Sequence, residues 1–487
     1  MVHHLATYGY SLAPCLILSA PLNYVYPLDS FHLRGTVIEV SNPPLPAPPA
    51  FLNGVPIGVV GCGYLGATHA ACLSHWGFNV VAIDVDPWKL DMLSSGRAPF
   101  FEDMLDPLLE EGITDKRLVF TSDVESLRTC RVVFSCVGTP QQPDSPAADL
   151  SQVEASFKML TRVLEPGAVV VGKSTVPVGM AEGYADLLAA AGLHLAWNPE
   201  FLREGTAVND TLHPERIVLG SQSPAVDSLL RMVYAVPLAE GCEWVSTDLT
   251  TAEMIKVSAN AFLASKVSFI NAVADLCDRT GADVVHVAHA LGLDSRIGKK
   301  FLSAGIGYGG GCFPKDVRAL AHRAAELGAT PLAAMLTATD AANHDARLRA
   351  LALVSGLVDE DTRKVAILGA AFKPGSDDVR DSPARWLVNE VRRKYPRVSL
   401  RWHDPAFQSG SSVDGIALSS SLVEAVADVD LVVLATEWPQ YRALNPRILT
   451  PRRRRVVDVR NCLPADAWSA AGWDLYRLGR PDVFSAE

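Results

Sequence analysis

Three absences limit what this chain of 487 residues can be. Its formal net charge is -11, whereas general nucleic-acid binding needs a basic surface that neutralises phosphates. Its nine cysteines are odd in number and include no CxxC pair, so neither a disulfide framework nor a zinc site is indicated. No uninterrupted apolar run reaches the roughly 18 residues of a membrane helix. We therefore expect a cytoplasmic protein without nucleic-acid, membrane or metal partners.

The first fifty residues also lack a clear signal. No Lys or Arg precedes Arg34, so the basic start of a secretory signal is missing. The stretch NPPLPAPPA is rich in proline and can continue neither a helix nor a central strand. We predict that residues 1–50 form a poorly ordered extension. His3 and His4, which lie in it, do not resemble a metal site.

From Val55 the sequence alternates regularly between predicted strands and helices, in a chain long enough for two or three domains. VPIGVVGCGYLG runs from a β-branched strand into a glycine loop, THAACLSHWG is typical of a helix, and NVVAIDVD of a second strand. A strand–helix–strand unit of this length implies a parallel sheet. RVVFSCVGTP, AVVVGKST and LAWNPEF continue the pattern. We predict a doubly wound domain over residues 51–245.

From Thr250 the pattern changes to one long helix in a predicted central domain, residues 246–345. No Pro or Gly interrupts it before Gly281, and about thirty residues exceed the usual helix length of about 11–12. Such a helix can join two domains and form a dimerisation surface, although a plain core helix is the alternative. The residues predicted on its apolar face are Met254, Val257, Ala261 and Ala264.

Alternation resumes at Lys364 and predicts a second α/β domain over residues 346–487. VAILGAAF, WHDP and VDLVVLATEW echo IGVVGCGYLG, AIDVDP and RVVFSCVGTP of the first domain. Any two doubly wound sheets could produce so weak an echo. The predicted fold class is α/β, with two Rossmann-like doubly wound domains joined by a long central helix. The run Arg452 to Arg455 leads into the strand VVDV in an acidic protein, so we interpret it as a solvated loop rather than a nucleic-acid patch.

The glycine loop after the first strand predicts a dinucleotide site. In its GxGxxG pattern Gly61 permits a tight turn, Gly63 a close approach of the pyrophosphate, and Gly66 close packing of helix on strand. Asp84 ends the second strand, where a carboxylate binds a ribose hydroxyl and repels a 2′-phosphate, which favours NAD over NADP. Lys89 either meets the adenosine end or is solvated. The predicted cofactor residues here are Gly61, Gly63, Tyr64, Leu65, Gly66, Asp84 and Lys89.

The segment GIGYGGGCFPKD predicts a reactive cysteine. A cysteine is usually inert and buried, but the glycines before Cys312 let backbone N–H groups and a ligand approach it closely. Lys315 and Asp316 follow directly. Lys256 and Asn260 are four positions apart on the long helix and therefore project from one face. As a purely structural pair they would be solvent-exposed, whereas burial among apolar residues would indicate a function.

Five segments together resemble one family: STVPVG, NPEFLREG, TAEMIKVSANAF, GYGGGCFPKD and FKPGSDDVRDSP. They resemble the UDP-glucose/GDP-mannose dehydrogenase family over residues 55–465, and most closely its members that act on UDP-glucose. The resemblance implies an enzyme that oxidises the C6 alcohol of UDP-glucose to a carboxylate and reduces two NAD per sugar. It also implies a homodimer or a higher homo-oligomer.

The resemblance further implies roles for single residues. Cys312 would be the nucleophile, forming first a thiohemiacetal and then a thioester. Lys256 and Asn260 would stabilise the oxyanions, Asp316 would orient water or lysine, and Glu200 would act as the base in the final hydrolysis.

The resemblance also implies contacts to the two ligands. Thr139 would place a water, and Pro177 would line the nicotinamide side with Thr175. Arg296 would reach the substrate of a neighbouring subunit, so the site would depend on dimerisation. The other implied cofactor contacts are Thr139, Thr175, Lys315 and Arg380. The implied substrate contacts are Glu200, Phe201, Leu202, Arg203, Glu204, Lys256, Asn260, Arg296, Phe301, Tyr308, Gly309, Gly310 and Lys373.

The chain departs from the family pattern at three places, none of which touches the reacting groups. Gly311 stands where the family often has serine, FFEDML replaces a commoner Tyr-Glu-Pro-Gly-Leu stretch, and Asp381 replaces a glutamate.

Three other functions stay open. A relative acting on GDP-mannose or a UDP-N-acetyl-hexosamine would share cofactor and mechanism, although enzymes for N-acetyl-hexosamines tend to have a different cysteine loop. A hydroxyacid or 6-phosphogluconate-type dehydrogenase would lack that loop and the C-terminal domain. A nucleotide sensor on a decayed scaffold would have lost reacting groups that are all present here.

Overall fold

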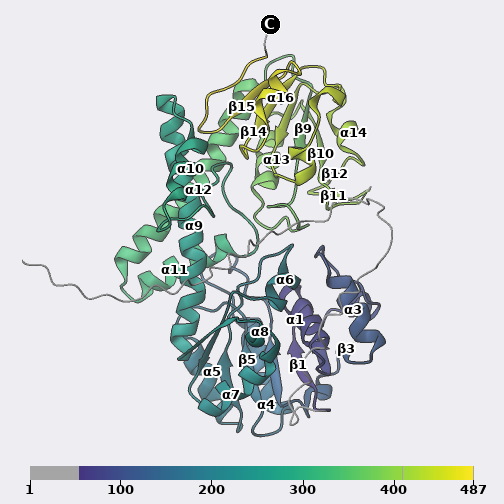
Figure 1. Cartoon of the computed structure of the whole chain (residues 1–487), viewed down its shortest axis with the longest axis vertical. Helices are drawn as coiled ribbons and strands as arrows, with labels where there is room; N and C mark the ends of the chain where they lie inside the picture. Colours follow the sequence, from purple (N-terminus) through teal and green to yellow (C-terminus); the bar gives the residue numbers. More distant parts are fainter. Residues whose placement is uncertain (1–53, 409, 486–487) are drawn as a thin grey trace, which may run out of the picture. The chain divides into compact units, whose positions relative to one another are not determined.

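The first sheet holds the predicted glycine loop at its centre. The structure, a computed structural model, describes residues 54–408 and 410–485, so the predicted extension over residues 1–50 lies outside the described residues. The strand order is β3-β2-β1-β4-β5-β6-β7-β8, and every neighbouring pair is parallel except β6 and β7. Figure 1 labels β1, β3 and β5 of this sheet. The strands are β1 (Ile57–Val60), β2 (Val80–Ile83), β3 (Leu118–Thr121), β4 (Val132–Ser135), β5 (Val169–Gly172), β6 (His194–Trp197), β7 (Arg216–Ser221) and β8 (Glu243–Thr247).

Helices cover both faces of this sheet, which is why its central strands are continuously apolar rather than alternating. Helix α1 begins at Tyr64, earlier than the predicted THAACLSHWG, because the backbone turns helical directly after Gly63. The helices are α1 (Tyr64–His75), α2 (Pro87–Ser94), α3 (Leu105–Thr114), α4 (Ser151–Val163), α5 (Ala181–Ala189), α6 (Ala207–Leu212), α7 (Pro224–Val233) and α8 (Ala235–Ala239).

The predicted long helix is confirmed as α9 (Leu249–Thr280). Asp248 caps its first turn by accepting a hydrogen bond from the Thr251 N–H, and Gly281, with φ of 76°, ends it. The predicted apolar face is wrong at Met254, which is 40% exposed. The reason is that the neighbours of α9 change along its length, from β7 and α5 at its start to α11 (Phe313–Glu326) and α12 (Thr330–Leu357) further on.

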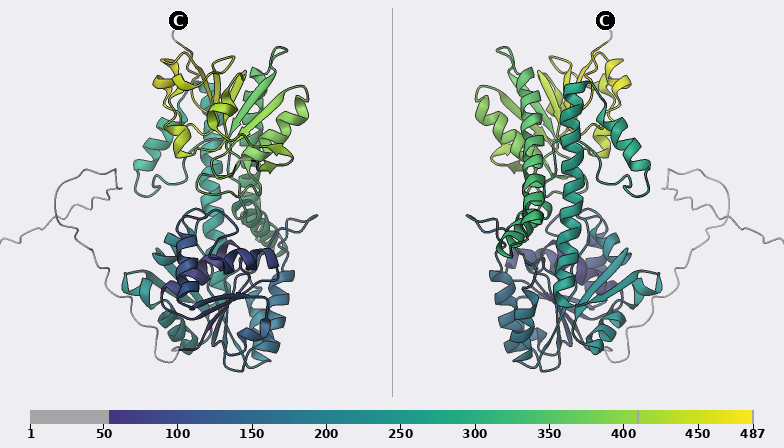
Figure 2. Two further views of the ribbon diagram at one scale, coloured as in Figure 1. Left: turned by 90° about the vertical axis from the view of Figure 1, so that its right-hand side faces the viewer. Right: turned by 90° about the vertical axis from the view of Figure 1, so that its left-hand side faces the viewer.

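Helix α9 is long and apolar enough to cross a membrane by length and composition alone. It packs instead against β7, α11 and α12, and Figure 2 shows α9 and α12 running side by side. It is therefore a central core helix and not a membrane span. A shorter helix, α10 (Val284–Leu293), follows it.

The second sheet has the strand order β10-β9-β13-β14-β15 and is parallel throughout. Its order β10-β9-β13 matches β2-β1-β4 of the first sheet, so the predicted echo is real and the predicted fold class is confirmed. The strands are β9 (Lys364–Leu368), β10 (Ser399–His403), β13 (Leu431–Leu434), β14 (Arg455–Asp458) and β15 (Asp474–Arg477), with a small hairpin of β11 (Ser412–Val413) and β12 (Ile416–Ala417). Its helices are α13 (Pro383–Lys394), α14 (Leu422–Val426), α15 (Pro439–Arg442) and α16 (Ala465–Ser469).

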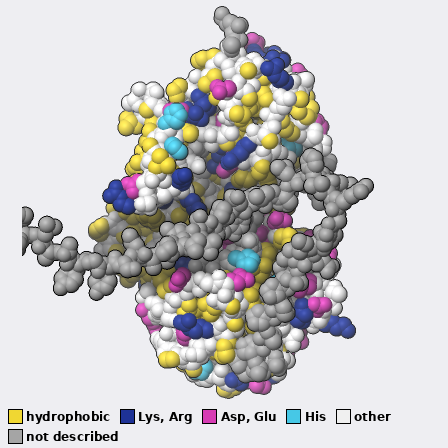
Figure 3. Space-filling view, viewed as in Figure 1, with side chains coloured by type: hydrophobic (Ala, Val, Ile, Leu, Met, Phe, Trp, Pro, Cys, Tyr) yellow, Lys and Arg dark blue, Asp and Glu magenta, His cyan; other side chains and the backbone are white. Residues whose placement is uncertain are grey.

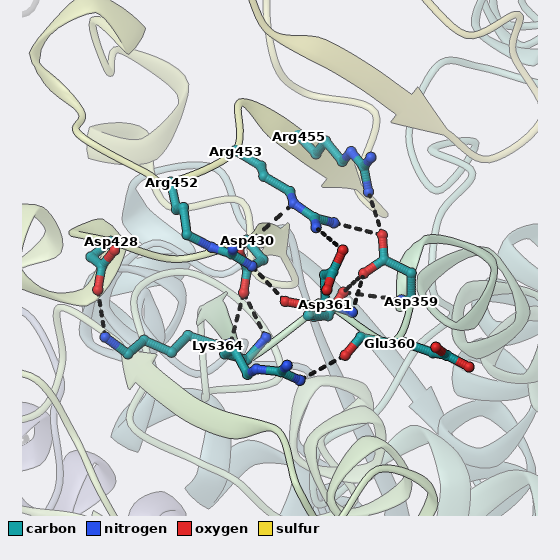
Figure 4. A network of polar contacts seen from close by, with 11 residues as sticks. Asp359, Glu360, Asp361, Lys364, Asp428, Asp430, Arg452, Arg453 and Arg455 are labelled. Atoms are coloured by element: carbon teal, nitrogen blue, oxygen red, sulfur yellow. Dashed lines mark hydrogen bonds and ion pairs between the residues drawn. The ribbon is translucent and has the colours of Figure 1, made fainter.

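The arginine run Arg452 to Arg455 is partly solvated, as predicted, with Arg452 and Arg454 exposed, and it is also paired with acidic side chains. Figure 4 shows Arg452 paired with Asp430 and Arg453 paired with Asp359. The Arg453–Asp359 distance is 2.6 Å. The acidic partners precede β9 and β13, whose amino ends meet the amino end of β14 in a parallel sheet, so the charges are neutralised locally. On the face drawn in Figure 3, basic and acidic side chains are likewise interspersed.

Candidate active site

The loop between β1 and α1 has the geometry of a phosphate cradle. Gly61 has φ of +89°, and a Cβ on Gly66 would lie 1.8 Å from the Gly61 carbonyl oxygen, so neither position tolerates a side chain. A Cβ on Gly63 would meet nothing within 4 Å. The loop therefore leaves open space at the N-terminus of α1, where backbone N–H groups and the helix dipole favour an anion.

Asp84 follows β2 directly and faces this loop. Its carboxylate accepts hydrogen bonds from the N–H groups of Cys62 (2.7 Å) and Asp86 (2.9 Å), and the Lys89 ammonium lies 3.7 Å away. The loop and Asp84 stand at the carboxyl ends of β1 and β2, beside the point where the strand order reverses between β1 and β4. Open α/β sheets bind ligands at such a point.

Tyr64 and Leu65, also predicted to meet the cofactor, make contacts within the protein. The Tyr64 hydroxyl donates a hydrogen bond to the Glu102 carboxylate and accepts one from the Gly205 N–H (2.6 Å). Leu65 packs against the hydrophobic core between α1 and the first sheet. Glu102 belongs to the unusual FFEDML segment and also accepts from the Ala207 N–H at 2.6 Å. Glu102 thus supplies the acid that caps α6, and it is a residue that FFEDML shares with the commoner Tyr-Glu-Pro-Gly-Leu stretch.

A first recess brings together predicted residues from three separate segments. Thr139 follows β4, Thr175 and Pro177 follow β5, and Lys315 and Asp316 lie in the first turn of α11. Among the residues on its wall that sequence reasoning missed, Gln141 and Arg323 have long polar side chains. Neither has a motif that would have revealed it.

Cys312 stands immediately before α11, as its N-cap, and its side chain is exposed. The other cysteines in the described residues are buried or half-buried. Asp316, one turn into α11, is buried and accepts hydrogen bonds from the Asn260 amide (2.7 Å) and the Lys315 ammonium (2.6 Å). The helix α9 and the cysteine loop are joined at this point, although they are far apart in sequence.

Charges of both signs act on the Cys312 thiol. The protein atoms crowded around it raise its pKa, the Asp316 carboxylate adds to the rise, and the charges of Lys256 and Lys315 oppose it. Lys256 also lies 5.3 Å from the centre of the Phe201 ring. The thiol is thus mainly protonated at rest and close to two cations that favour its thiolate.

Glu200 is held by a buried lysine that sequence reasoning missed. The Lys173 ammonium lies 3.0 Å from one Glu200 oxygen, and the N–H groups of Phe201 (2.7 Å) and Leu202 (3.0 Å) donate to the other. Burial would raise the pKa of Glu200, but Lys173, the Phe201 N–H and the charge of Lys256 together outweigh it, and the net shift is downward. The sequence signal was a lysine directly after the apolar strand AVVVG, which is rarely buried without a partner.

A second recess lies beside the glycine-rich loop. Four predicted substrate residues line it, and so do Phe372, Glu437 and Arg460, which we did not predict. The Arg460 guanidinium donates to the carbonyl oxygens of Ala435 (2.7 Å), Gly307 (3.2 Å) and Phe372 (3.2 Å), and so joins three loops around the recess. The predicted residues on its wall are Phe301, Tyr308, Gly309 and Lys373.

The glycines before Cys312 are required by close neighbours. A Cβ on Gly309 would lie 2.3 Å from the Asp381 carbonyl oxygen, and one on Gly310 2.8 Å from the Phe372 ring. A Cβ on Gly311 would lie 2.6 Å from the Arg380 guanidinium carbon. Arg380 therefore covers the position where the family often has serine.

Several predicted substrate residues line neither recess, and the two exposed arginines among them, Arg203 and Arg296, are paired within the chain. Arg203 is exposed and binds Asp210, with its Nη2 at 2.6 Å. Arg296 is 86% exposed at its side chain and lies 2.6 Å from Asp294. Arg296 thus reaches neither recess within its own subunit.

Comparison with known proteins covers nearly the whole described chain. The NAD binding, central and UDP binding domains of the UDP-glucose/GDP-mannose dehydrogenase family match residues 55–237, 250–345 and 366–465. A UDP-glucose 6-dehydrogenase of Rhizobium meliloti (strain 1021) is 39% identical over 440 residues, covering 88% of this chain and 100% of the relative.

Two solved structures have the same fold. A UDP-glucose dehydrogenase from Pyrobaculum islandicum has a TM-score of 0.74 at 33% identity, covering 88% of this chain and 96% of its own. A UDP-D-ManNAc dehydrogenase from Pyrococcus horikoshii has a TM-score of 0.78 at 26% identity, covering 88% and 100%. Because all three family domains match in order, the chain belongs to the UDP-glucose/GDP-mannose dehydrogenase family and is an NAD-dependent oxidoreductase.

Proposed function

We propose that this protein oxidises UDP-glucose to UDP-glucuronate through a covalent intermediate on Cys312 and reduces two NAD per sugar. The observation that carries the proposal is the exposed Cys312 at the start of α11, beside Asp316, Lys315 and Asn260. The identity of 39% with a UDP-glucose 6-dehydrogenase supports the choice of sugar.

The residues after β1 fit NAD. The space above Gly63 admits a pyrophosphate to the N-terminus of α1, and Asp84 at the edge of the loop suits a ribose diol. When bound, NAD accepts the hydride in each oxidation. Thr139, Thr175 and Lys315 would border its reactive ring, and Lys89 and Arg380 are further contacts in this proposal.

Oxidation of a primary alcohol to an acid removes four electrons, so the carbon must be held between two hydride transfers. In our proposal C6 first loses a hydride while its hydroxyl proton passes to a base, which gives the aldehyde. The Cys312 thiol then releases its proton to solvent, the thiolate attacks the C6 aldehyde, and Lys256 and Asn260 donate to the oxyanion that forms. Loss of the second hydride leaves a thioester. Glu200, kept ionised by Lys173, then accepts the proton of the attacking water, with Thr139 or Asp316 orienting that water.

The second recess is our proposed site for the UDP-sugar. Phe301, Tyr308, Gly309 and Lys373 line it, and the chain's match to a UDP binding domain lies over residues 366–465. Gly310 and the FLRE segment after Glu200 would complete the contacts. We infer the same division of labour for the whole chain: residues 51–245 bind the cofactor, residues 246–345 join subunits, and residues 346–487 bind the nucleotide sugar.

An exposed apolar stripe supports a homodimer or higher homo-oligomer. Phe262, Phe269 and Leu276 recur every seven residues on α9 and are 67%, 56% and 60% exposed. Such a stripe on a long helix is suited to a second copy of the same helix. Arg296 would then reach the neighbour's substrate. The free thiols of the described chain fit the reducing cytoplasm, where we place the enzyme.

The sugar is tested by mixing the protein with NAD and one nucleotide sugar at a time, and by measuring NADH absorbance. We expect two NADH for each UDP-glucose consumed, and little release with GDP-mannose. A ratio of one would identify a simple alcohol dehydrogenase. Faster turnover of UDP-N-acetylmannosamine would favour the second candidate function, a UDP-N-acetyl-hexosamine dehydrogenase. The fold of the Pyrococcus horikoshii structure supports that candidate.

The covalent step is tested by Cys312→Ser. We expect net acid formation to fall by at least about 10³-fold, because serine is a far poorer nucleophile without an adjacent base, while NADH binding stays unchanged. Cys242→Ser, at a half-buried cysteine outside both recesses, is the matched control and should keep full activity. Normal production of UDP-glucuronate by the Cys312→Ser protein would end the covalent proposal.

A further inference from the structure

The loop that carries Thr175 and Pro177 is attached to the protein from two sides. We propose that Glu253 and Arg323 are positioning residues, which hold loop 174–180 in register with the reacting groups on α9 and α11. The proposal rests on the proposed function only in that it assigns the first recess to the nicotinamide end of NAD.

Glu253 makes the first attachment. It lies on α9, one turn before Lys256, and is only 2% exposed. Its two carboxylate oxygens accept separate hydrogen bonds, from the Gly179 N–H (2.6 Å) and from the Ala181 N–H (2.7 Å), at the start of α5. A buried carboxylate is costly unless it is fully bonded, so these two bonds account for its presence inside a largely apolar helix.

Arg323 makes the second attachment, from α11. Its Nε donates to the Val178 carbonyl oxygen at 3.0 Å, and its side chain lines the first recess. Gly179 has φ of +88°, and a Cβ there would lie 3.6 Å from Arg323 Nη2. The loop thus turns sharply between the two side chains: Arg323 binds its Val178 carbonyl, and Glu253 binds its N–H groups.

The attachments join the loop to the two helices that hold the chemistry. Helix α9 carries Lys256 and Asn260, and α11 begins at Cys312. Thr175 and Pro177 face the same recess as Lys315 and Asp316. If the loop shifts, the nicotinamide surface shifts relative to the sulfur, and a displacement of about 1 Å can lower a rate by about 10²-fold.

Glu253→Gln tests the first attachment, because an amide oxygen replaces only one of the two acceptors. We expect the KM for NAD to rise and kcat to fall, each by about 3–30-fold, while the KM for the sugar nucleotide stays within about twofold. Arg323→Gln should give the same pattern. Glu182→Gln is the matched control: its exposed carboxylate lies in the first turn of α5 and binds Gln222, outside the loop.

Two further measurements need no turnover, so they remain valid if the sugar is wrong. NADH binding, followed by fluorescence, should weaken in Glu253→Gln and Arg323→Gln but not in Glu182→Gln. Hydrogen exchange should quicken at the amides of Gly179 and Ala181 in Glu253→Gln. A purely structural role would instead reduce the active fraction and leave both KM values and NADH affinity unchanged, and that result would overturn the proposal. If Glu253→Gln does not fold, the KM for NAD and the NADH affinity of Arg323→Gln alone test the proposal.

Discussion

The turns after β1 and after β9 stand at the same position in their sheets, and each begins with a glycine of positive φ, +89° at Gly61 and +108° at Gly369. Counted from these glycines, Gly63 corresponds to Ala371 and Gly66 to Pro374. A Cβ at Gly63 would point into open space, whereas Ala371 is fully buried. Only the first turn therefore leads straight into a helix whose N-terminus is open to an anion.

The acidic residues beside the two turns differ in the same way. Asp84 accepts from the N–H groups of Cys62 and Asp86 and lies 3.7 Å from the Lys89 ammonium. Asp404 is 2% exposed and accepts from the N–H groups of Ala370 (2.6 Å) and Ala371 (3.0 Å) and from the Trp438 indole (3.1 Å). The two acids thus differ in their surroundings: Asp84 lies beside a loop with open space at Gly63, whereas Asp404 bonds two N–H groups of its own turn and the Trp438 indole.

Gly66→Ala should break the first turn and have the largest effect. The added Cβ would meet the backbone oxygen of Gly61, which cannot rotate away, so we expect a loss of about 3 kcal/mol or more in the free energy of unfolding and loss of NADH binding. Urea unfolding and NADH fluorescence measure the two effects. Gly63→Ala, with open space around its Cβ, should keep the stability and weaken only NADH binding; unfolding of both variants alike would refute the comparison.

Asp404→Asn should separate the two acids. At least one buried donor loses its acceptor, so we expect the free energy of unfolding to fall by about 2 kcal/mol while NADH affinity is retained. Asp84→Asn should show the reverse: little change in stability, but an NADH dissociation constant about tenfold higher and a smaller preference for NAD over NADP. The comparison fails if both variants lose stability equally and bind NADH equally well.

Glu204→Gln tests where the two halves meet, and we expect the smallest effect. Glu204, after β6, binds Arg380 at 3.3 Å, and burial with the nearby Asp378 raises its pKa to about 7. The folded protein therefore holds a proton that the unfolded chain releases at lower pH, so stability falls as pH rises from about 4.5 to 7.

In Glu204→Gln this contribution disappears, and we expect the decline in the free energy of unfolding between pH 5 and 7 to shrink by on the order of 1 kcal/mol. Urea unfolding at several pH values measures it, with the exposed Glu110→Gln as control. Burial also raises the pKa of Glu253 to about 7. Glu253 therefore still lowers the free energy of unfolding as pH rises, and part of the decline remains in the Glu204→Gln protein. An unchanged pH dependence in Glu204→Gln would show that the loops of the two halves are not coupled there.

Much of the fold followed from local patterns. Apolar runs with glycine turns predicted β1, β2, β4 and β9, and an uninterrupted helical pattern predicted α9, because these signals act within a few turns of chain. The pattern failed at Met254, because the spacing of apolar residues along a helix does not show which elements pack against each part of it. It also did not reveal the acidic partners of the arginine run, Asp359 and Asp430, because they precede other strands.

The sequence by itself determined which reactive residue types are present and in what order: the glycine loop, Asp84, Lys256, Asn260 and the cysteine loop. Only the tertiary structure decided which of them meet, because hydrogen bonds such as Asn260 to Asp316 and Glu253 to Gly179 join segments separated by dozens of residues. Burial decided the rest. Lys173 became the partner of Glu200 only when folding removed both from water and left each charge dependent on the other.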